Sequence, residues 1–145
     1  MDTTSTHLIC EFSGCNREAL SSVMAIKNAM YAAARESNAT VLHGYFHQFT
    51  PSGVSGVLGL AESHISIHTW PEADYAAIDI FTCGHTATPI KGISYLKGAL
   101  HARDVKITDI TRGIPLPDGT FTCRIHSNQT VKPHESAEVA AVIKA

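Results

Sequence analysis

Residues 61–72, which read Ala-Glu-Ser-His-Ile-Ser-Ile-His-Thr-Trp-Pro-Glu, constrain the fold more than any other stretch of this chain. The alternation of a β-strand places the polar and aromatic residues on one face and the apolar ones on the other: His64, Ser66, His68 and Trp70 against Ile65, Ile67 and Thr69. One face can therefore pack into a core while the other presents hydrogen-bonding groups. A half-solvated antiparallel strand has the same alternation, so the pattern alone does not define a functional site.

The rest of the chain predicts further strands and two helices in one domain spanning residues 1–145. Alternating residues predict strands at 7–12, 40–49, 54–60, 75–81 and 105–110, and a short one at 120–125. Helical spacing predicts amphipathic helices at 17–37, after an N-cap at Asn16, and from 88 to about 101. This order favours an α/β (α+β) two-layer sandwich, with helices on one face of a mainly antiparallel sheet. Residues from about 127 to 145 are expected to form a flexible tail.

Composition excludes several classes of function. The 11 Lys and Arg residues against 13 Asp and Glu leave a net charge of −2 without a block of like charge, so neither nucleic acid nor a membrane surface is an expected partner. The first six residues lack the basic-then-apolar order of a signal peptide, and no apolar run approaches the ~20 residues of a membrane span. We therefore expect a cytoplasmic protein. Its four cysteines have no CxxC spacing, so reduced thiols are expected.

Two simple readings of the histidines are disfavoured. His43 with His47, or His64 with His68, would be an i, i+4 metal pair, but on a strand such residues lie far apart and the helical HExxH context is missing, so no metal is expected. Ser63 with His68 as its base would suggest a serine hydrolase, but the chain has neither a GxSxG elbow nor a recognisable third member.

The strand at 54–60 is unusual because Gly53, Gly56 and Gly59 fall in or beside it. Glycine weakens a strand unless another group comes close to the backbone. Close approach is therefore expected just before residues 61–72.

Three motifs at fixed spacing resemble those of the bacterial S-adenosylmethionine decarboxylase proenzymes, a family of pyruvoyl-dependent decarboxylases. They are Phe46-His-Gln-Phe-Thr-Pro-Ser-Gly-Val-Ser-Gly56, Glu62-Ser-His-Ile-Ser-Ile-His-Thr-Trp-Pro-Glu72 and Tyr75-Ala-Ala-Ile-Asp-Ile-Phe-Thr-Cys-Gly84. The similarity covers roughly His7 to Gly113, and three linked motifs are far more specific than a lone Ser-His pair.

The resemblance implies that the chain cleaves itself. Ser63 would attack the carbonyl of Glu62, and elimination would then leave residues 1–62 as a β chain and residues 63–145 as an α chain. Ser63 would become a covalent pyruvoyl group, the cofactor that forms a Schiff base with the substrate amine. Ser55 would stabilise the processing intermediate, and His68 would remove the α-proton of Ser63.

The same resemblance implies the substrate contacts. Cys83 would donate a proton to the product, Phe49 would stack on adenine, and Glu72 would accept hydrogen bonds from the ribose. Trp70 would line the pocket. Without the resemblance, Cys83 is a small buried apolar residue, Phe49 and Trp70 are packing residues, and Glu72 belongs to the surface. Family members also form dimers in which the two sheets pack face to face. A homodimer of this kind would cover the sheet face that the helices leave free in each chain.

The expected reaction converts S-adenosylmethionine to decarboxylated S-adenosylmethionine and CO2 for spermidine and other polyamines. Departures from the family pattern lie at Ser5-Thr6, where Gly-Arg is common, at Gln48, where a basic residue is usual, and at His85, where an acidic residue is frequent. They leave open a pyruvoyl-dependent L-ornithine or L-arginine decarboxylase. A third alternative is an uncleaved homologue without catalytic activity.

Overall fold

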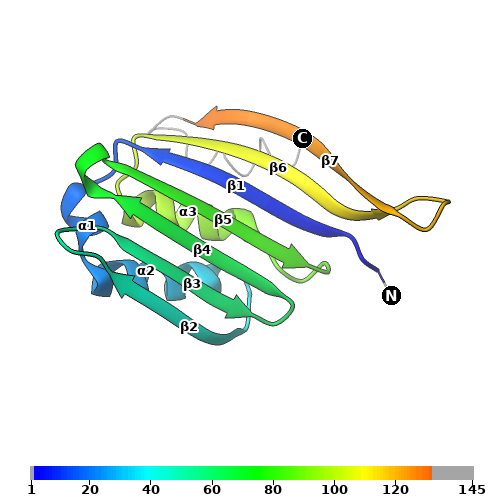
Figure 1. Ribbon diagram of the computed structural model, residues 1–145, viewed down its shortest axis with the longest axis horizontal. Helices are drawn as coiled ribbons and strands as arrows, with labels where there is room; N and C mark the ends of the chain where they lie inside the picture. The colour runs from blue at the N-terminus through cyan, green and yellow to red at the C-terminus, as the bar shows by residue number, and fades with distance from the viewer. Residues whose placement is uncertain (1, 132–145) are drawn as a thin grey trace.

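Seven strands form one sheet in the order β2-β3-β4-β5-β1-β6-β7, and every neighbouring pair is antiparallel. The structure, a computed structural model, describes residues 2–131. The strands are β1 (Ser5–Ser13), β2 (Val41–Gln48), β3 (Val54–Leu60), β4 (Ser63–Trp70), β5 (Tyr75–Cys83), β6 (Asp104–Pro115) and β7 (Phe121–Val131). The helices α1 (Arg17–Ser21), α2 (Val23–Glu36) and α3 (Pro89–Ala99) all lie behind the sheet, with a 3-10 turn η1 (Pro71–Ala73) after β4 (Figure 1). The expected two-layer sandwich is confirmed.

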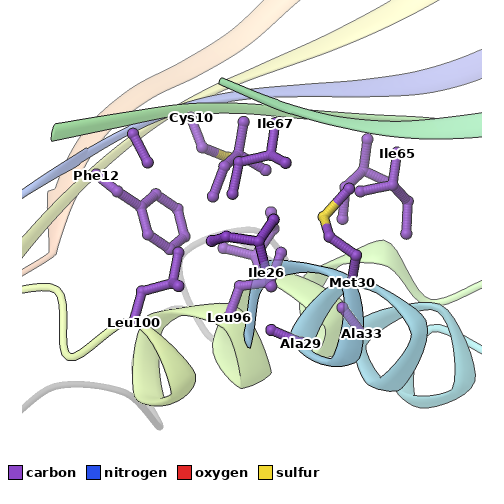
Figure 2. Close-up of a cluster of buried hydrophobic side chains, with 14 of the residues drawn as sticks. Cys10, Phe12, Ile26, Ala29, Met30, Ala33, Ile65, Ile67, Leu96 and Leu100 are labelled. Carbon is purple, nitrogen blue, oxygen red and sulfur yellow. The ribbon is translucent and has the colours of Figure 1, made fainter. Parts of the chain in front are cut away.

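The core lies between the sheet and the helices, and strand alternation decides which side chains enter it. On β1, Leu8, Cys10 and Phe12 are fully buried, and on β4 the same holds for Ile65 and Ile67. Between the layers, Figure 2 shows the labelled side chains of β1 and β4 meeting those of α2, of α3 and of Leu100, which follows α3: Cys10, Phe12, Ile65 and Ile67 against Ile26, Ala29, Met30, Ala33, Leu96 and Leu100. Because burying a large apolar side chain contributes about 1.5–3 kcal/mol, this cluster fixes which face of β4 turns outward.

The helical region at 17–37 differs from its prediction, because it is two helices and not one. Asn16 caps α1 as expected, its side chain accepting a hydrogen bond from Ala19 N–H at 2.9 Å. Ser22 then adopts an extended backbone (φ −99°, ψ 113°) and caps α2 by accepting from Ala25 N–H at 3.1 Å. An N-cap serine adopts an extended backbone while its side chain accepts a hydrogen bond from a free N–H group of the following helix. Ser22 therefore interrupts the helical region and separates α1 from α2.

The C-terminal strands are longer than predicted. β6 continues through Arg112 and Gly113 to Pro115, and β7 runs to Val131 along the edge of the sheet. The expectation of a loose chain from residue 127 is therefore wrong for 127–131, which pair with β6. The rest of that expected tail, residues 132–145, lies outside the described residues.

Two features of the fold bear on function. The N-terminal strand β1 inserts between β5 and β6, so that His7 faces Phe81 across the ladder. The helix-free face of the sheet is left open (Figure 1). Within residues 2–131, no helix is long and apolar enough to cross a membrane.

Candidate active site

The predicted site residues fall into two clusters at opposite ends of β4. At the first end, β3 and β4 are joined by residues 61 and 62, and Ser63 pairs with Leu60 across the hairpin. Glu62 has a positive φ of 61°, a left-handed conformation that costs a residue with a side chain about 1–2 kcal/mol. The half-buried Ser63 hydroxyl accepts a hydrogen bond of 3.3 Å from the backbone N–H of Cys83, which ends the neighbouring strand β5. The structure thus places Glu62, Ser63 and Cys83 together.

The glycines before this hairpin allow side chains of β2 to lie directly on β3. A Cβ atom at Gly56 would be 2.5 Å from the ring of Phe46, and one at Gly59 would be 3.0 Å from the ring of His43. The expected close approach is confirmed, and the approaching groups are aromatic rings of the adjacent strand.

The second cluster surrounds Ser55 and His68, which are direct partners across the β3–β4 ladder. The Ser55 hydroxyl and His68 Nδ1 are 2.8 Å apart and hydrogen-bonded. Both line a cavity of about 300 Å³ that also contains Phe49, Trp70 and Glu72. The structure therefore brings five predicted site residues from three segments to one cavity.

Aromatic stacking fixes the wall of this cavity. Trp70 stacks on Tyr75 of β5, with ring centroids 5.3 Å apart and planes inclined by 22°. The Tyr75 hydroxyl donates to the Glu11 carboxylate on β1. Burial, together with this hydrogen bond, raises the pKa of Tyr75 to about 12. Trp70 is thus held on one side, while 43% of it stays exposed toward the open face.

The two clusters do not meet within one chain. Ser63 and His68 are five positions apart on an extended strand, which at about 3.3 Å per residue separates them by about 16 Å. The Ser55–His68 pair therefore cannot reach the Glu62–Ser63 bond of its own chain.

A third group of polar side chains lies between the clusters and was missed by the sequence analysis. His7, His64 and Asp79 bring their ligand-type atoms within 4.8 Å of one another. The sequence analysis considered His64 with His68, but in the structure His64 contacts Asp79 of β5. The spacing of His7, His64 and Asp79 in the sequence does not predict this group, because the three side chains meet only when β1 pairs with β5.

Two of the family departures lie away from the cavity. Gln48 accepts a hydrogen bond from Val23 N–H at 3.1 Å and donates to Gly53 O at 3.0 Å, so its side chain connects α2 to the loop that carries Phe49. The side chain of His85 is 91% exposed, with Asp2 3.7 Å away. Neither side chain lines the cavity.

Fold and site together define a class of protein: a two-layer α/β sandwich with serine and cysteine where β4 begins and β5 ends, and a hydroxyl–imidazole pair beside a cavity at the other end of β4. The family model for S-adenosylmethionine decarboxylase matches residues 6–113, which include both clusters. The chain belongs to the S-adenosylmethionine decarboxylase family.

Individual relatives agree with this assignment. The chain is 49% identical to an S-adenosylmethionine decarboxylase proenzyme of Thermotoga maritima and 48% identical to one of Thermosipho melanesiensis, each over 113 residues that cover 78% of this chain and 87% of the relative. The crystal structure of the adenosylmethionine decarboxylase from Aquifex aeolicus VF5 is similar with a TM-score of 0.68 and 26% identity, covering 91% of this chain and 96% of that one. The resemblance inferred from the three motifs is confirmed.

Proposed function

We propose that this chain is a self-processing decarboxylase that converts S-adenosylmethionine to decarboxylated S-adenosylmethionine and CO2, a precursor step for polyamines. Relatives 48–49% identical to it carry the name S-adenosylmethionine decarboxylase proenzyme, which states both a reaction and a precursor form. The observation in this chain that carries the proposal is the strained Glu62–Ser63 turn beside Cys83.

The turn supports cleavage between residues 62 and 63. The Ser63 hydroxyl oxygen bonds to the Glu62 carbonyl carbon as the peptide C–N bond breaks, and release of the left-handed Glu62 favours that step. Removal of the Ser63 α-proton by an imidazole then expels the Glu62 carboxylate together with the serine oxygen. Hydrolysis by water releases the nitrogen as ammonia and leaves a ketone at residue 63.

The surroundings of residue 63 fit the resulting pyruvoyl group. The Cys83 N–H donates to the side-chain oxygen of residue 63 before cleavage, so a backbone donor lies beside residue 63 when that oxygen has left with Glu62. Beside Cys83, a Cβ atom at Gly84 would meet no atom within 4 Å, which leaves room for a substrate. When formed, this group would accept the substrate amine and take up the electrons freed as CO2 leaves. The half-buried Cys83 thiol would supply a proton to the product.

The base for processing comes from a second copy of the chain. Ser55 and His68 lie about 16 Å from Ser63 of the same chain, yet their mutual hydrogen bond orients the imidazole for proton transfer. In a two-fold dimer, His68 of each copy can face Ser63 of the other, which completes two equal sites.

The open sheet face is suited to this homodimer. It exposes apolar side chains from three strands, namely Ile9, Val57 and Trp70, which are 37%, 41% and 43% exposed. Strand alternation places Cys83 and the Ser55–His68 pair on this face, and Ser63 begins β4 at its end. Packing this face against a second copy would therefore bury apolar surface and bring a Ser55–His68 pair toward each Ser63.

The cavity beside His68 suits the nucleoside part of the substrate. Phe49 is 47% exposed in the cavity wall and offers a ring on which adenine can stack. Glu72 lies in the same cavity and can accept hydrogen bonds from two ribose hydroxyls. L-ornithine and L-arginine have no counterpart to either contact, and Gln48 does not reach the cavity to favour them.

Mass spectrometry of the purified protein, followed by CO2 release from carboxyl-labelled S-adenosylmethionine, ornithine and arginine, tests the proposal. We expect two fragments separated after Glu62, a pyruvoyl mass at residue 63 and CO2 from S-adenosylmethionine alone. Ser63→Ala should stay intact, and Cys83→Ala should be cleaved but lose about 100-fold in decarboxylation. Cys123→Ala, on exposed β7, is the matched control. An intact wild-type chain, or cleaved protein inactive on S-adenosylmethionine, would reject the function.

A further inference from the structure

Asp79 lies between the two clusters on the open face of the sheet, and three side chains converge on its carboxylate. His7 Nε2 on β1 is 2.6 Å from Oδ2, and His64 Nε2 on β4 is 2.9 Å from the same oxygen. The Ser66 hydroxyl, directly across the β4–β5 ladder, donates to Oδ1. The side chains of Asp79 and His7 are only 23% and 14% exposed. The proposed reaction gives none of these groups a task.

The three groups form a hydrogen-bonded network around a carboxylate anion. Burial alone would raise the pKa of Asp79, but the hydrogen bonds from Ser66, His7 and His64 outweigh it and hold that pKa below its usual range. Arg112 Nη1 is 3.3 Å from His7 Nδ1, and a guanidinium can only donate. His7 therefore accepts at Nδ1 and carries its proton on Nε2, toward Asp79.

The proton on His7 Nε2 argues that this group is a hydrogen-bonded network and not a metal site, although its residue types could bind a metal ion. A His7 nitrogen that holds a proton has no lone pair for a metal ion. The separations of 2.6 and 2.9 Å are also hydrogen-bond lengths, shorter than the ~3.3 Å that separates two ligands 2.0–2.1 Å from a tetrahedral metal.

His64 is held at its ring face as well as at its nitrogen. Its imidazole stacks on Phe81, with centroids 5.7 Å apart and planes inclined by 9°. His7 packs edge-on against the same ring at 5.5 Å, and the Arg112 guanidinium lies 5.4 Å from its centroid. Phe81 and Asp79 together fix His64 in one orientation.

The contacts of His64 with Asp79 and Phe81 become important after cleavage, because His64 directly follows Ser63. In the intact chain, residue 63 is held by the two-residue hairpin to β3. Once the peptide bond between residues 62 and 63 is broken, residue 63 becomes a chain end, and chain ends fray unless side chains hold them. The side chain nearest to that new end is His64.

Resting on the proposed function, we propose that Asp79 is a positioning residue which, through His64, keeps residue 63 beside Cys83 after the chain is cleaved. The network then has little effect on the precursor and a large one on the mature protein. Asp79 acts through His64 and does not contact the substrate.

Hydrogen–deuterium exchange of the 64–66 amides, compared in four proteins, tests this assignment. The cleaved wild type and cleaved Asp79→Asn form one pair, and Ser63→Ala with and without Asp79→Asn forms the uncleaved pair. We expect Asp79→Asn to speed exchange at least about tenfold in the cleaved pair and little in the uncleaved pair. In the mature protein kcat should fall about tenfold with KM nearly unchanged.

Controls separate this role from general destabilisation. Asp104→Asn, at the far end of β6, removes a carboxylate that bonds the exposed Arg103 and should change neither exchange nor kcat. His64→Gln keeps a donor toward Asp79 and should restore part of the protection that His64→Leu loses.

Three results would overturn the assignment: equal acceleration in both pairs, no acceleration in either, or a stoichiometric divalent metal that Asp79→Asn loses. An uncleaved wild-type chain would instead defeat the proposed function, and its mass reveals that before any exchange is measured.

Discussion

At the scale of single residues, the four cysteines lie in different environments that separate the proposed proton donor from the rest. Cys10 and Cys15 are buried, Cys83 is half-buried and Cys123 is exposed on β7. Burial, together with nearby carboxylates, raises the pKa of the Cys10 thiol strongly and that of Cys15 to about 11. Both of these thiols are therefore unreactive packing residues at neutral pH.

Alkylation rates should follow this order. With iodoacetamide at pH 8, peptide-resolved mass spectrometry should find Cys123 modified first and Cys83 next, with Cys10 and Cys15 modified only after unfolding. Decarboxylation should fall in step with Cys83 modification and not with that of Cys123. Modification of Cys10 in the native protein would contradict the packing of β1.

Tyr75 gives a pH-dependent prediction. Its pKa is raised to about 12 by burial and by its hydrogen bond to Glu11, so the protonated phenol is the form that the fold favours. A raised folded pKa means that this stabilisation is complete below pH 10 and is lost as pH rises from 10 to 12. Ultraviolet titration should show a phenol ionising near pH 12 that Tyr75→Phe removes and the exposed Tyr45→Phe does not. If the ionisation near pH 12 disappeared in the Tyr45→Phe variant, its assignment to Tyr75 would be contradicted.

Gln48 should influence substrate binding through the Phe49 loop. Gln48→Ala removes the hydrogen bonds to Val23 N–H and Gly53 O, so the loop becomes less ordered. Since one hydrogen bond is worth about 1 kcal/mol, KM for S-adenosylmethionine should rise about fivefold with kcat nearly unchanged. A fall in kcat at constant KM would instead place Gln48 in the reaction.

At the scale of elements, α2 and α3 pack closely where Gly92 faces Ser37. Any Cβ atom at Gly92 would overlap Ser37 Oγ and come within 3.0 Å of Ala33 O. Among the buried side-chain nitrogen and oxygen atoms of residues 2–131, Ser37 Oγ is the one without a hydrogen-bond partner. This close approach explains why a glycine is tolerated inside α3, where it weakens the helix.

A double-mutant cycle tests the contact. Gly92→Ala should lower the free energy of unfolding by about 1–3 kcal/mol through overlap. Ser37→Ala should raise it by about 1 kcal/mol because an unpaired buried hydroxyl is removed. The double variant should be more stable than the sum of the two single changes predicts, because Ser37→Ala removes the atom that a Cβ at Gly92 would overlap, as measured by urea unfolding. Strict additivity would contradict a direct contact between the two positions.

Elements with a strong alternating pattern could be predicted from the sequence, and elements defined by long-range pairing could not. β3 begins at Val54 and ends at Leu60 as predicted, because its apolar residues and the turns on both sides are local signals. β6 and β7 were underestimated, because Gly113, Pro115 and Pro117 resemble a turn while pairing continues through Pro115. The helix break at Ser22 was missed because the apolar spacing continues across it.

The same distinction holds for the site. The motifs predicted Ser55, Ser63, His68 and Cys83 as site residues, with His68 acting on Ser63. In the structure, Ser55 is hydrogen-bonded to His68, and Ser63 to the backbone N–H of Cys83. The sequence could not show that the two pairs are separated along β4, since this follows from the register of the hairpin. Nor could it show the Asp79 network, which requires the pairing of β1 with β5.

At the scale of the whole molecule, one chain carries two incomplete half-sites at opposite ends of β4. Each chain carries a serine that its own histidine cannot reach. In the proposed dimer, a second copy would supply the missing half. Sedimentation should therefore find a dimer. A charged residue at Val57, in the middle of β3 and 41% exposed, should weaken the dimer and slow cleavage together.

Cross-complementation between two inactive variants tests this central claim most directly. Ser63→Ala and His68→Ala chains, carrying different tags, are produced separately and together, and mixed dimers are isolated through both tags. In a mixed dimer, one site combines the intact Ser63 of the His68→Ala chain with the intact His68 of the Ser63→Ala chain. We predict that the His68→Ala chain is cleaved after Glu62 in mixed dimers and stays intact when produced alone. If it stays intact in isolated mixed dimers, or is cleaved without its partner, the shared active site is contradicted.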